Sequence, residues 1–196
     1  MAILDIFNNE IVEFVNFPND QVFSIEFGAG RGCFGKKFLP ACYLTDAVNN
    51  NLPHFRELEE YSENSQCHYL DSMYDFINSE DLGRTFTKLI FCNPYDFGVG
   101  GYGETKQFLS RAGQLLDVGG EILMIGGVKN RWVKHKNAVT FYEELIAHNN
   151  LSYEFQISQP IVLDENHEYR QNHVFTLCDI NVEIKPTQMY KITKVA

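Results

Sequence analysis

Residues 25–32, with the sequence IEFGAGRG, limit the folds open to this chain more than any other stretch. An apolar run that carries an acid, Glu26, leads directly into glycines at positions 28, 30 and 32. Glycine permits positive φ angles and lets a ligand lie against the backbone. A buried strand followed by such a loop is typical of α/β folds that bind a ligand at the start of a helix.

Strand-like apolar runs alternate with helical patterns along the chain. Strands are predicted at residues 22–27, 42–45, 66–70, 88–92, 121–125, 153–157 and 173–177. Amphipathic helices are predicted at 104–116 and 139–148, and the Asp117–Gly120 stretch is predicted to turn into the next strand. This alternation predicts a doubly wound α/β fold, with a mostly parallel seven-stranded sheet and helices on both faces. The last stretch is strand-rich with no clear helix, so we expect an antiparallel C-terminal hairpin.

The length of 196 residues, without repeats or an obvious linker, predicts a single domain over 1–196. A short N-terminal helical segment is expected at 1–21, with its helix at 10–17. It precedes a half at 22–127, which carries the glycine loop, and a C-terminal half at 128–196.

Charge and cysteine content exclude several classes of protein. A formal net charge of −10 argues against a protein that binds nucleic acid along a whole face. A local basic patch is compatible with this net charge. The absence of a long apolar run and of a signal-peptide pattern predicts a cytoplasmic protein without a membrane span. The five cysteines, at 33, 42, 67, 92 and 178, are scattered without zinc spacing, so we expect free thiols and no metal.

Two interpretations of the glycines involve phosphate-bearing ligands. Residues 30–36 match the phosphate-loop pattern G-x-x-x-x-G-K, but Lys37 stands where Ser or Thr would hold magnesium. Residues 30–35 match the dinucleotide pattern G-x-G-x-x-G, whose acidic partner is expected about 20 residues later. Asp46, the only candidate, comes earlier than that.

A third interpretation accounts for more of the residues. The form acid-x-G-x-G-x-G, made by Glu26, Gly28, Gly30 and Gly32, resembles motif I of the class I S-adenosylmethionine-dependent methyltransferases. The resemblance implies that this loop, with Ala29, binds S-adenosylmethionine. It also implies that Glu26 contacts the methionine moiety near its amino group, although an acid can also simply cap or solvate the end of a strand.

Two further acids follow the second and third predicted strands in the order found in that family. The resemblance implies that Asp46, with Ala47, accepts hydrogen bonds from the ribose hydroxyls, a task suited to a carboxylate. It implies that Asp71, with Ser72 and Met73, contacts the adenine. Asp at such a position is also a common turn or helix-cap residue. The resemblance makes 22–127 the cofactor-binding half and 128–196 the substrate side.

After the fourth predicted strand comes Asn93-Pro94-Tyr95. It resembles the [DNS]-P-P-[YFW] motif of methyltransferases that act on planar nitrogens, with one proline fewer, and the D-P-W segment of tRNA guanine-N7 methyltransferases. The resemblance implies that these are catalytic residues, that Asn93 also borders the cofactor, and that Asn93 and Tyr95 orient a planar acceptor. Asn-Pro-Tyr is also an ordinary strand-to-loop turn.

Two loops are predicted to contact the substrate. Tyr102 lies in the glycine-rich stretch 96–103, which is either a mobile loop over the substrate or a plain surface loop. Arg131 and Trp132 lie in the basic stretch 129–136, where a cation can contact phosphate while the indole stacks on a base. A solvated basic loop with one anchored aromatic is the alternative.

These features predict an S-adenosylmethionine-dependent methyltransferase that transfers a methyl group to a nitrogen of a planar acceptor, either a base or an amide. A nucleic acid, a nucleotide-like molecule, a protein side chain and a small metabolite all stay open as acceptors. No separate target-recognition domain fits in the chain. If the acceptor is a long nucleic acid, a partner subunit is therefore one means by which its sequence could be recognised. A non-catalytic S-adenosylmethionine-binding subunit and an NAD-dependent reductase are the alternative functions.

Overall fold

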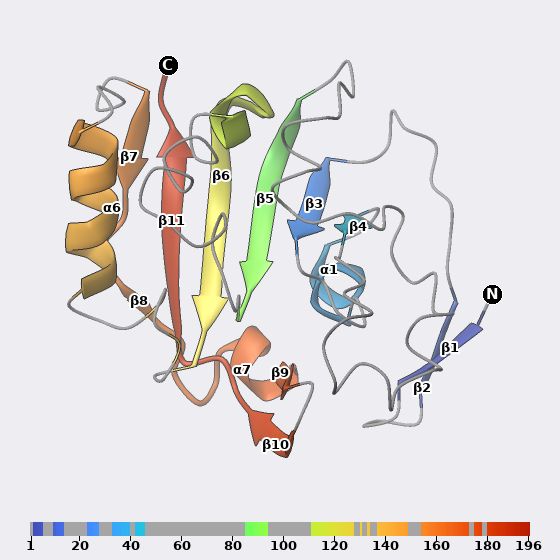
Figure 1. The fold of residues 1–196 in the computed structure, drawn as a ribbon. Helices are drawn as coiled ribbons and strands as arrows, with labels where there is room; N and C mark the ends of the chain where they lie inside the picture. Colours follow the sequence, from blue (N-terminus) through green and yellow to red (C-terminus); the bar gives the residue numbers. More distant parts are fainter. Residues whose placement is uncertain are drawn as a thin grey trace, which may run out of the picture.

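The structure, a computed structural model, describes a set of segments that include a central sheet (Figure 1). The described residues are 2–5, 10–13, 23–27, 33–39, 42–45, 85–93, 111–127, 130, 133, 137–148, 154–172, 175–177 and 180–196.

The central sheet mixes parallel and antiparallel strands in the order β4-β3-β5-β6-β11-β7. The six strands of this path are β3 (Ser24–Phe27), β4 (Cys42–Thr45), β5 (Phe86–Cys92), β6 (Leu116–Gly126), β7 (Phe155–Ile157) and β11 (Gln188–Lys194). The two-residue β8 (Ile161–Val162) pairs with β11 off the path. The four strands from β4 to β6 are parallel, and β11 runs antiparallel to β6, β7 and β8. The predicted mixed α/β sheet is therefore confirmed. The predicted strand at 66–70 lies outside the described residues, so the predicted seven-stranded, doubly wound count stays a prediction.

The four parallel strands end at a common edge of the sheet. The register pairs Phe27 with both Thr45 and Phe91, and it pairs Cys92 with Ile125. We call this edge, where β4, β3, β5 and β6 end, the carboxyl edge. All four residues of β3 are buried, which is typical of a strand inside a parallel sheet covered on both faces.

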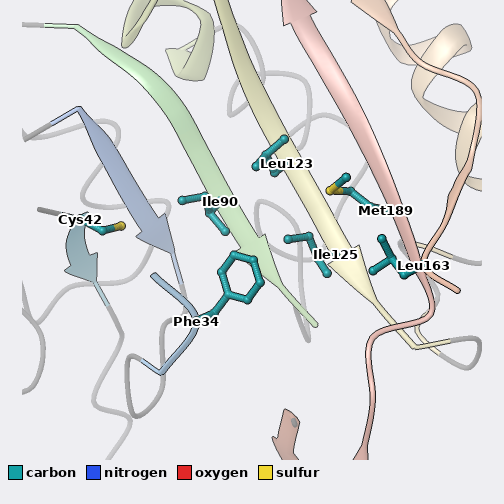
Figure 2. Close-up of a cluster of buried hydrophobic side chains, with 7 residues drawn as sticks. All are labelled: Phe34, Cys42, Ile90, Leu123, Ile125, Leu163 and Met189. Atoms are coloured by element: carbon teal, nitrogen blue, oxygen red, sulfur yellow. The ribbon is translucent and has the colours of Figure 1, made fainter. Parts of the chain in front are cut away.

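One face of the sheet is covered by α1 (Cys33–Phe38). The parallel register places Glu26, Ile90 and Leu123 on this first face. Phe34 of α1 lies in the same buried cluster as Ile90 and Leu123 (Figure 2). The remaining members of the cluster are Cys42, Ile125, Leu163 and Met189.

The opposite face is covered by α6 (Asn137–His148), which confirms the helix predicted at 139–148. Tyr190 pairs with Met124 in the register and so lies on this second face. The buried Tyr142 of α6 lies close enough to Tyr190 for the two phenols to interact electrostatically, and burial chiefly raises the pKa of Tyr142. Helices therefore cover both faces, as expected.

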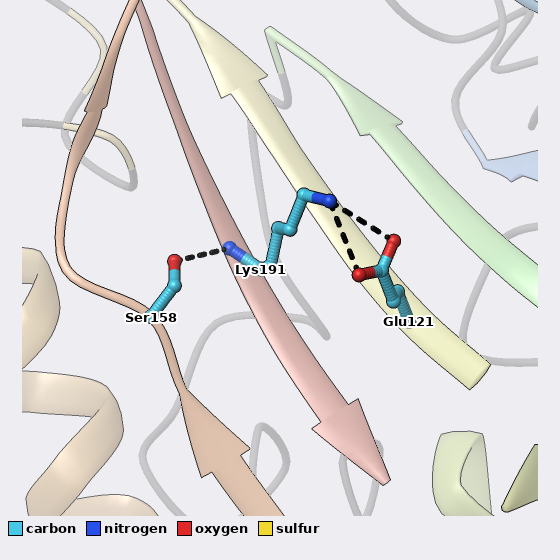
Figure 3. A network of polar contacts seen from close by, with 3 residues as sticks. All are labelled: Glu121, Ser158 and Lys191. Atoms are coloured by element: carbon cyan, nitrogen blue, oxygen red, sulfur yellow. Dashed lines mark hydrogen bonds and ion pairs between the residues drawn. The ribbon is translucent and has the colours of Figure 1, made fainter. Parts of the chain in front are cut away.

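Polar contacts join the antiparallel strands on the first face. Lys191 of β11 donates from Nζ to Glu121 of β6 at 3.1 and 3.3 Å (Figure 3). The backbone N–H of Lys191 donates to Oγ of Ser158, just beyond β7, at 3.0 Å. Because both charged side chains are partly exposed, the ion pair contributes at most about 1 kcal/mol.

Residues 158–187, between β7 and β11, form an insertion that contains β8, α7 (Glu168–Asn172), β9 (Phe175–Leu177) and β10 (Ile180–Ile184). Figure 1 shows α7, β9 and β10 next to the ends of β5 and β6. The expected antiparallel end is present, but its pairing differs from the prediction. β7 pairs with β11, whereas β9 pairs with β10 in a separate two-stranded sheet. The helix α7 was not predicted.

The predicted N-terminal helix at 10–17 is wrong over residues 10–13. These residues form β2 (Glu10–Glu13), which pairs antiparallel with β1 (Ala2–Asp5). Ile11 and Val12 are β-branched, which favours a strand, and the backbone of the short segment pairs with β1, whereas an isolated helix of this length is marginal. Residues 14–21 lie outside the described residues.

The helix predicted at 104–116 extends too far at its C-terminal end. Residues 111–114 are helical, but Leu116 already begins β6. The predicted turn at Asp117–Gly120 is a bulge inside β6, because the pairing with β5 jumps from Phe86–Leu116 to Lys88–Glu121. Gly119 absorbs the extra residues with a φ of 85°, a conformation that glycine adopts without strain.

In the part of the chain that the structure describes, no helix has both the length and the apolar character needed to cross a membrane.

We expect Gly113→Ala to lower the free energy of unfolding by about 1–3 kcal/mol, as overpacking does. A Cβ on Gly113 would overlap the ring of the buried Phe155, with Cε2 at 3.0 Å and Cζ closer still. Urea unfolding followed by circular dichroism measures the loss. Adding Phe155→Leu, which removes the end of the ring, should restore part of it. A Gly113→Ala protein as stable as the wild type would contradict this packing.

Candidate functional site

The carboxyl edge brings together the strands that precede three of the predicted site segments. β3 ends one residue before Gly28, β4 one residue before Asp46, and β5 one residue before Asn93. Because these strands are neighbours in parallel register, the three segments start at the same edge. Open α/β sheets bind their ligands outside this edge.

Glu26 is a structural acid at the end of β3. Its side chain is only 1% exposed, and Oε2 accepts the backbone N–H of Gly35 at 2.7 Å. Since α1 begins at Cys33, this N–H belongs to the first turn, where helical N–H groups lack partners within the helix. A carboxylate is favourable at that end of a helix. Glu26 therefore ties the end of β3 to α1 across the glycine loop, and its contact with a methionine moiety stays a prediction.

The carboxylate of Glu26 also affects its neighbour Cys42 on β4. Burial, and after it the negative charge of Glu26, raise the pKa of the Cys42 thiol well above its ordinary value. Hydrogen bonds with the Ser24 side chain and the Glu26 backbone act in the opposite direction, but they are smaller effects. The thiol therefore stays protonated and behaves as part of the apolar core.

Asn93 has an unusual backbone directly after β5. Its φ of 50° is the only positive value for a non-glycine residue in the described segments. Asparagine is among the few residues that adopt this left-handed conformation readily. Its N–H donates to the carbonyl oxygen of Ile125 at 2.6 Å, so β6 holds the backbone at this point.

A second asparagine, which the sequence pattern did not single out, holds the side chain of Asn93. Nδ2 of Asn130 donates to Oδ1 of Asn93 at 3.0 Å. Asn130 follows β6 and is itself held by its N–H, which donates to the carbonyl oxygen of Gly127 at 2.9 Å. Asn93 and Asn130, one of the residues of the basic stretch 129–136, are therefore in contact. The one sequence signal for Asn130 was a polar residue just after a strand that ends at the carboxyl edge.

The insertion contributes Tyr169 to the first face beside this edge. Its ring packs against Phe34 and Phe38 of α1, with centroids 5.0 and 4.8 Å apart. Burial, and then the nearby Glu168 and Cys92, raise the pKa of its hydroxyl. Nothing in the sequence pattern predicted that Tyr169 would lie against α1.

Backbone hydrogen bonds fasten the insertion to the carboxyl edge. Leu163 N–H donates to the carbonyl oxygen of Thr187 at 2.9 Å, and Thr187 N–H donates to that of Gly126 at 3.0 Å. Since Gly126 is the last residue of β6, the two ends of the insertion are anchored next to the strand that precedes Asn130.

The other predicted site residues lie outside the described residues, and their arrangement stays a prediction. They are Gly28, Ala29, Gly30, Gly32, Asp46, Ala47, Asp71, Ser72, Met73, Pro94, Tyr95, Tyr102, Arg131 and Trp132. Within the described segments, no three His, Cys, Asp or Glu side chains gather as metal ligands would.

No protein-family model and no curated protein matches the sequence. The fold, however, resembles solved methyltransferases. The glycopeptide N-methyltransferase MtfA, solved with S-adenosylhomocysteine, is 10% identical with a TM-score of 0.51, over 87% of this chain and 82% of that one. An rRNA methylase from Streptococcus thermophilus is 11% identical over 90% and 89%, with a TM-score of 0.48. The N-methyltransferase NodS from Bradyrhizobium japonicum WM9 is 11% identical over 88% and 78%, with a TM-score of 0.46.

The likeness to MtfA shows that this chain has the fold of the class I methyltransferases. The resemblance found in the sequence is therefore confirmed at the level of the fold.

We expect Glu26→Ala to lower the free energy of unfolding by about 1–3 kcal/mol, because it leaves the buried N–H of Gly35 without its acceptor. Glu26→Gln keeps a side-chain oxygen that can accept the same N–H, so its loss should be smaller. Urea unfolding of the three proteins measures both losses. If Glu26→Ala were as stable as the wild type, the hydrogen bond would contribute nothing to the attachment of α1 to β3.

Cys42 predicts a loss of stability at alkaline pH. Its folded pKa lies above the ordinary thiol value of 9.0. Its contribution is therefore complete below that value and declines as pH rises above it, because unfolding then releases a proton. Between about pH 7.5 and about pH 9.5 the wild type should lose about 1 kcal/mol more than Cys42→Ala. Urea unfolding at both pH values measures the difference, and equal losses would contradict it.

Proposed function

We propose that this chain is an S-adenosylmethionine-dependent methyltransferase that acts on a nitrogen of a planar acceptor, a base or an amide. The main support for the proposal is the arrangement of residues at the carboxyl edge. There Glu26 and Asn93, from the two segments that resemble methyltransferase motifs, lie at the ends of the neighbouring strands β3 and β5, and hydrogen bonds hold both. The fold supports the same conclusion.

The described residues fit S-adenosylmethionine as cofactor. Glu26 places a buried carboxylate at the end of β3, and residues 28–32, three of them glycine, connect it to α1. S-adenosylmethionine has no phosphates and carries an ammonium and a sulfonium, so acids and close backbone approach suit it better than a phosphate loop does. Gly28 to Gly32 would hold the methionine moiety, Asp46 and Ala47 the ribose, and Asp71, Ser72 and Met73 the adenine.

When bound, this cofactor would supply an electrophilic methyl group, which a nitrogen lone pair would attack directly, so that the N–C bond forms as the C–S bond breaks and S-adenosylhomocysteine leaves. The chain's own residues therefore need to orient the acceptor more than to exchange protons. Asn93 would accept an N–H of the acceptor through Oδ1, and Tyr95 would stack on its plane. The nitrogen lone pair then points away from the N–H that Asn93 holds, and the proton lost from nitrogen passes to solvent.

A nucleotide-like acceptor is the form of this proposal that uses most of the chain. Arg131 and Trp132 follow β6 in the same basic stretch as Asn130, which contacts Asn93. A cation for phosphate and an indole for stacking are what a nucleotide would use there, with Tyr102 as a further contact. We also propose that residues 66–70 extend the sheet beside β4 and complete the seven-stranded, doubly wound arrangement.

Calorimetric titration of the purified chain with S-adenosylhomocysteine, NAD and ATP tests the cofactor. We expect S-adenosylhomocysteine alone to bind, in the micromolar range. Asp46→Ala should abolish measurable binding, because it removes the carboxylate expected to hold both ribose hydroxyls. Glu144→Ala, which removes an exposed acid on α6, is the matched control and should bind normally. A preference for NAD or ATP, or no binding at all, would overturn the proposal.

The acceptor is tested with S-adenosylmethionine labelled with tritium in its methyl group. Total RNA and total protein are incubated separately with the chain and then digested to nucleosides and amino acids. An N-methylated base or N-methylglutamine is the expected product, and Asn93→Ala should slow its formation by about a hundredfold. An O-methylated product would keep the methyltransferase and reject the nitrogen acceptor. Binding without any transfer would favour a non-catalytic subunit.

A further inference from the structure

We propose that Asn130 is a positioning residue for Asn93, and that it turns the Asn93 carboxamide so that its oxygen faces the acceptor. The two asparagines would form an amide pair selective for acceptors that present an N–H, such as an exocyclic amine or a primary amide. This inference rests on the proposed function and adds to it the residue that sets the acceptor's orientation.

The backbone of Asn93 is already fixed before its side chain is considered. Its N–H is held by Ile125 at 2.6 Å, and its φ of 50° places it in a narrow left-handed region. Asn93 is half-buried at the end of a strand whose residues Leu89, Ile90 and Phe91 are fully buried. The remaining freedom of this residue is the rotation of its carboxamide.

That rotation matters because the two ends of a carboxamide have nearly the same shape and opposite chemistry. The oxygen accepts hydrogen bonds and the nitrogen donates them, so only the surrounding hydrogen bonds decide which end faces a ligand. The N–H of an acceptor binds the oxygen and is repelled by the NH2 group. Without a partner that fixes the rotation, Asn93 would present the wrong end for part of the time.

Asn130 supplies such a partner from the neighbouring strand end. Its Nδ2 donates to Oδ1 of Asn93 at 3.0 Å, which selects one of the two orientations. A carbonyl oxygen can accept two hydrogen bonds, so this bond fixes the oxygen and leaves it able to accept an N–H from a ligand.

The position of Asn130 is itself constrained, as a positioning residue requires. Its N–H is held by Gly127 at 2.9 Å, and its carbonyl oxygen accepts the N–H of the buried Val133 at 3.2 Å. A Cβ on Gly126 would lie 3.2 Å from Cβ of Asn130 and 2.9 Å from Cγ2 of Val133. The segment after β6 therefore folds back onto the strand end, and only a glycine at 126 leaves room for it.

The test measures binding of two planar probes, adenosine 5′-monophosphate and N-acetylglutaminamide, to protein saturated with S-adenosylhomocysteine. Nuclear magnetic resonance titration suits weak ligands of this kind. We expect at least one probe to bind the wild type and to bind Asn130→Ala about three- to tenfold more weakly, which is the range for one neutral hydrogen bond. The affinity for S-adenosylhomocysteine should not change, because Asn130 acts on the acceptor side.

Two variants separate positioning from a general structural role. Asn130→Asp keeps the size of the side chain but loses the donor, so it should weaken the probe at least as much as Asn130→Ala. Gln156→Ala removes an exposed carboxamide on β7, level with Glu121 and far from the carboxyl edge, and should leave probe binding unchanged. If Asn130→Ala lowers the melting temperature, the affinity of Asn130→Asp for the probe is compared with that of the wild type instead.

Each outcome decides the inference. Unchanged probe binding in Asn130→Asp would overturn it. Failure of both probes to bind the wild type saturated with S-adenosylhomocysteine would also overturn it, while the proposed cofactor would stand. Failure of S-adenosylhomocysteine itself to bind would overturn the proposed function, and the inference with it.

Discussion

The hydrogen bond between the buried carboxylate of Glu26 and the N–H of Gly35 is the contact on which the carboxyl edge depends. A carboxylate at 1% exposure is costly unless it is bonded, and this one stabilises the first turn of a helix in return. The bond fixes where α1 begins relative to β3, and so fixes the span of the glycine loop. Phe34 and Phe38 follow on α1 and set the surface against which Tyr169 packs.

The other half of the edge is organised by β6. Its carbonyl groups hold Asn93 through Ile125 and Thr187 through Gly126, while the segment after it carries Asn130. The strand that carries no motif of its own therefore positions the side chain expected to meet the acceptor. β6 thus joins the end of β5 to the insertion.

The sequence predicted those features of the structure that depend on a short stretch of chain, and it failed where a feature depends on contacts between distant residues. β4 was predicted to the residue and β3 nearly so, because short apolar runs between turn signals are a property of the segment itself. Glu26 and Asn93 were singled out because motif spacing is also local, and their functional roles stay predictions. Asn130 and Tyr169 were missed because their roles come from contacts across the fold, and residues 10–13 were misassigned because strand pairing outweighed a weak helical pattern.

The placement of the insertion has a consequence for how such chains diverge. Residues 158–187 leave the sheet from β7 and return through β11, two adjacent antiparallel strands. A connection of this kind can lengthen, shorten or be exchanged with little entropic cost and without shifting the register of the parallel strands. The residues of the insertion that do not pack on the core, unlike Leu163 and Tyr169, can therefore change while β3, β4, β5 and β6 keep their register.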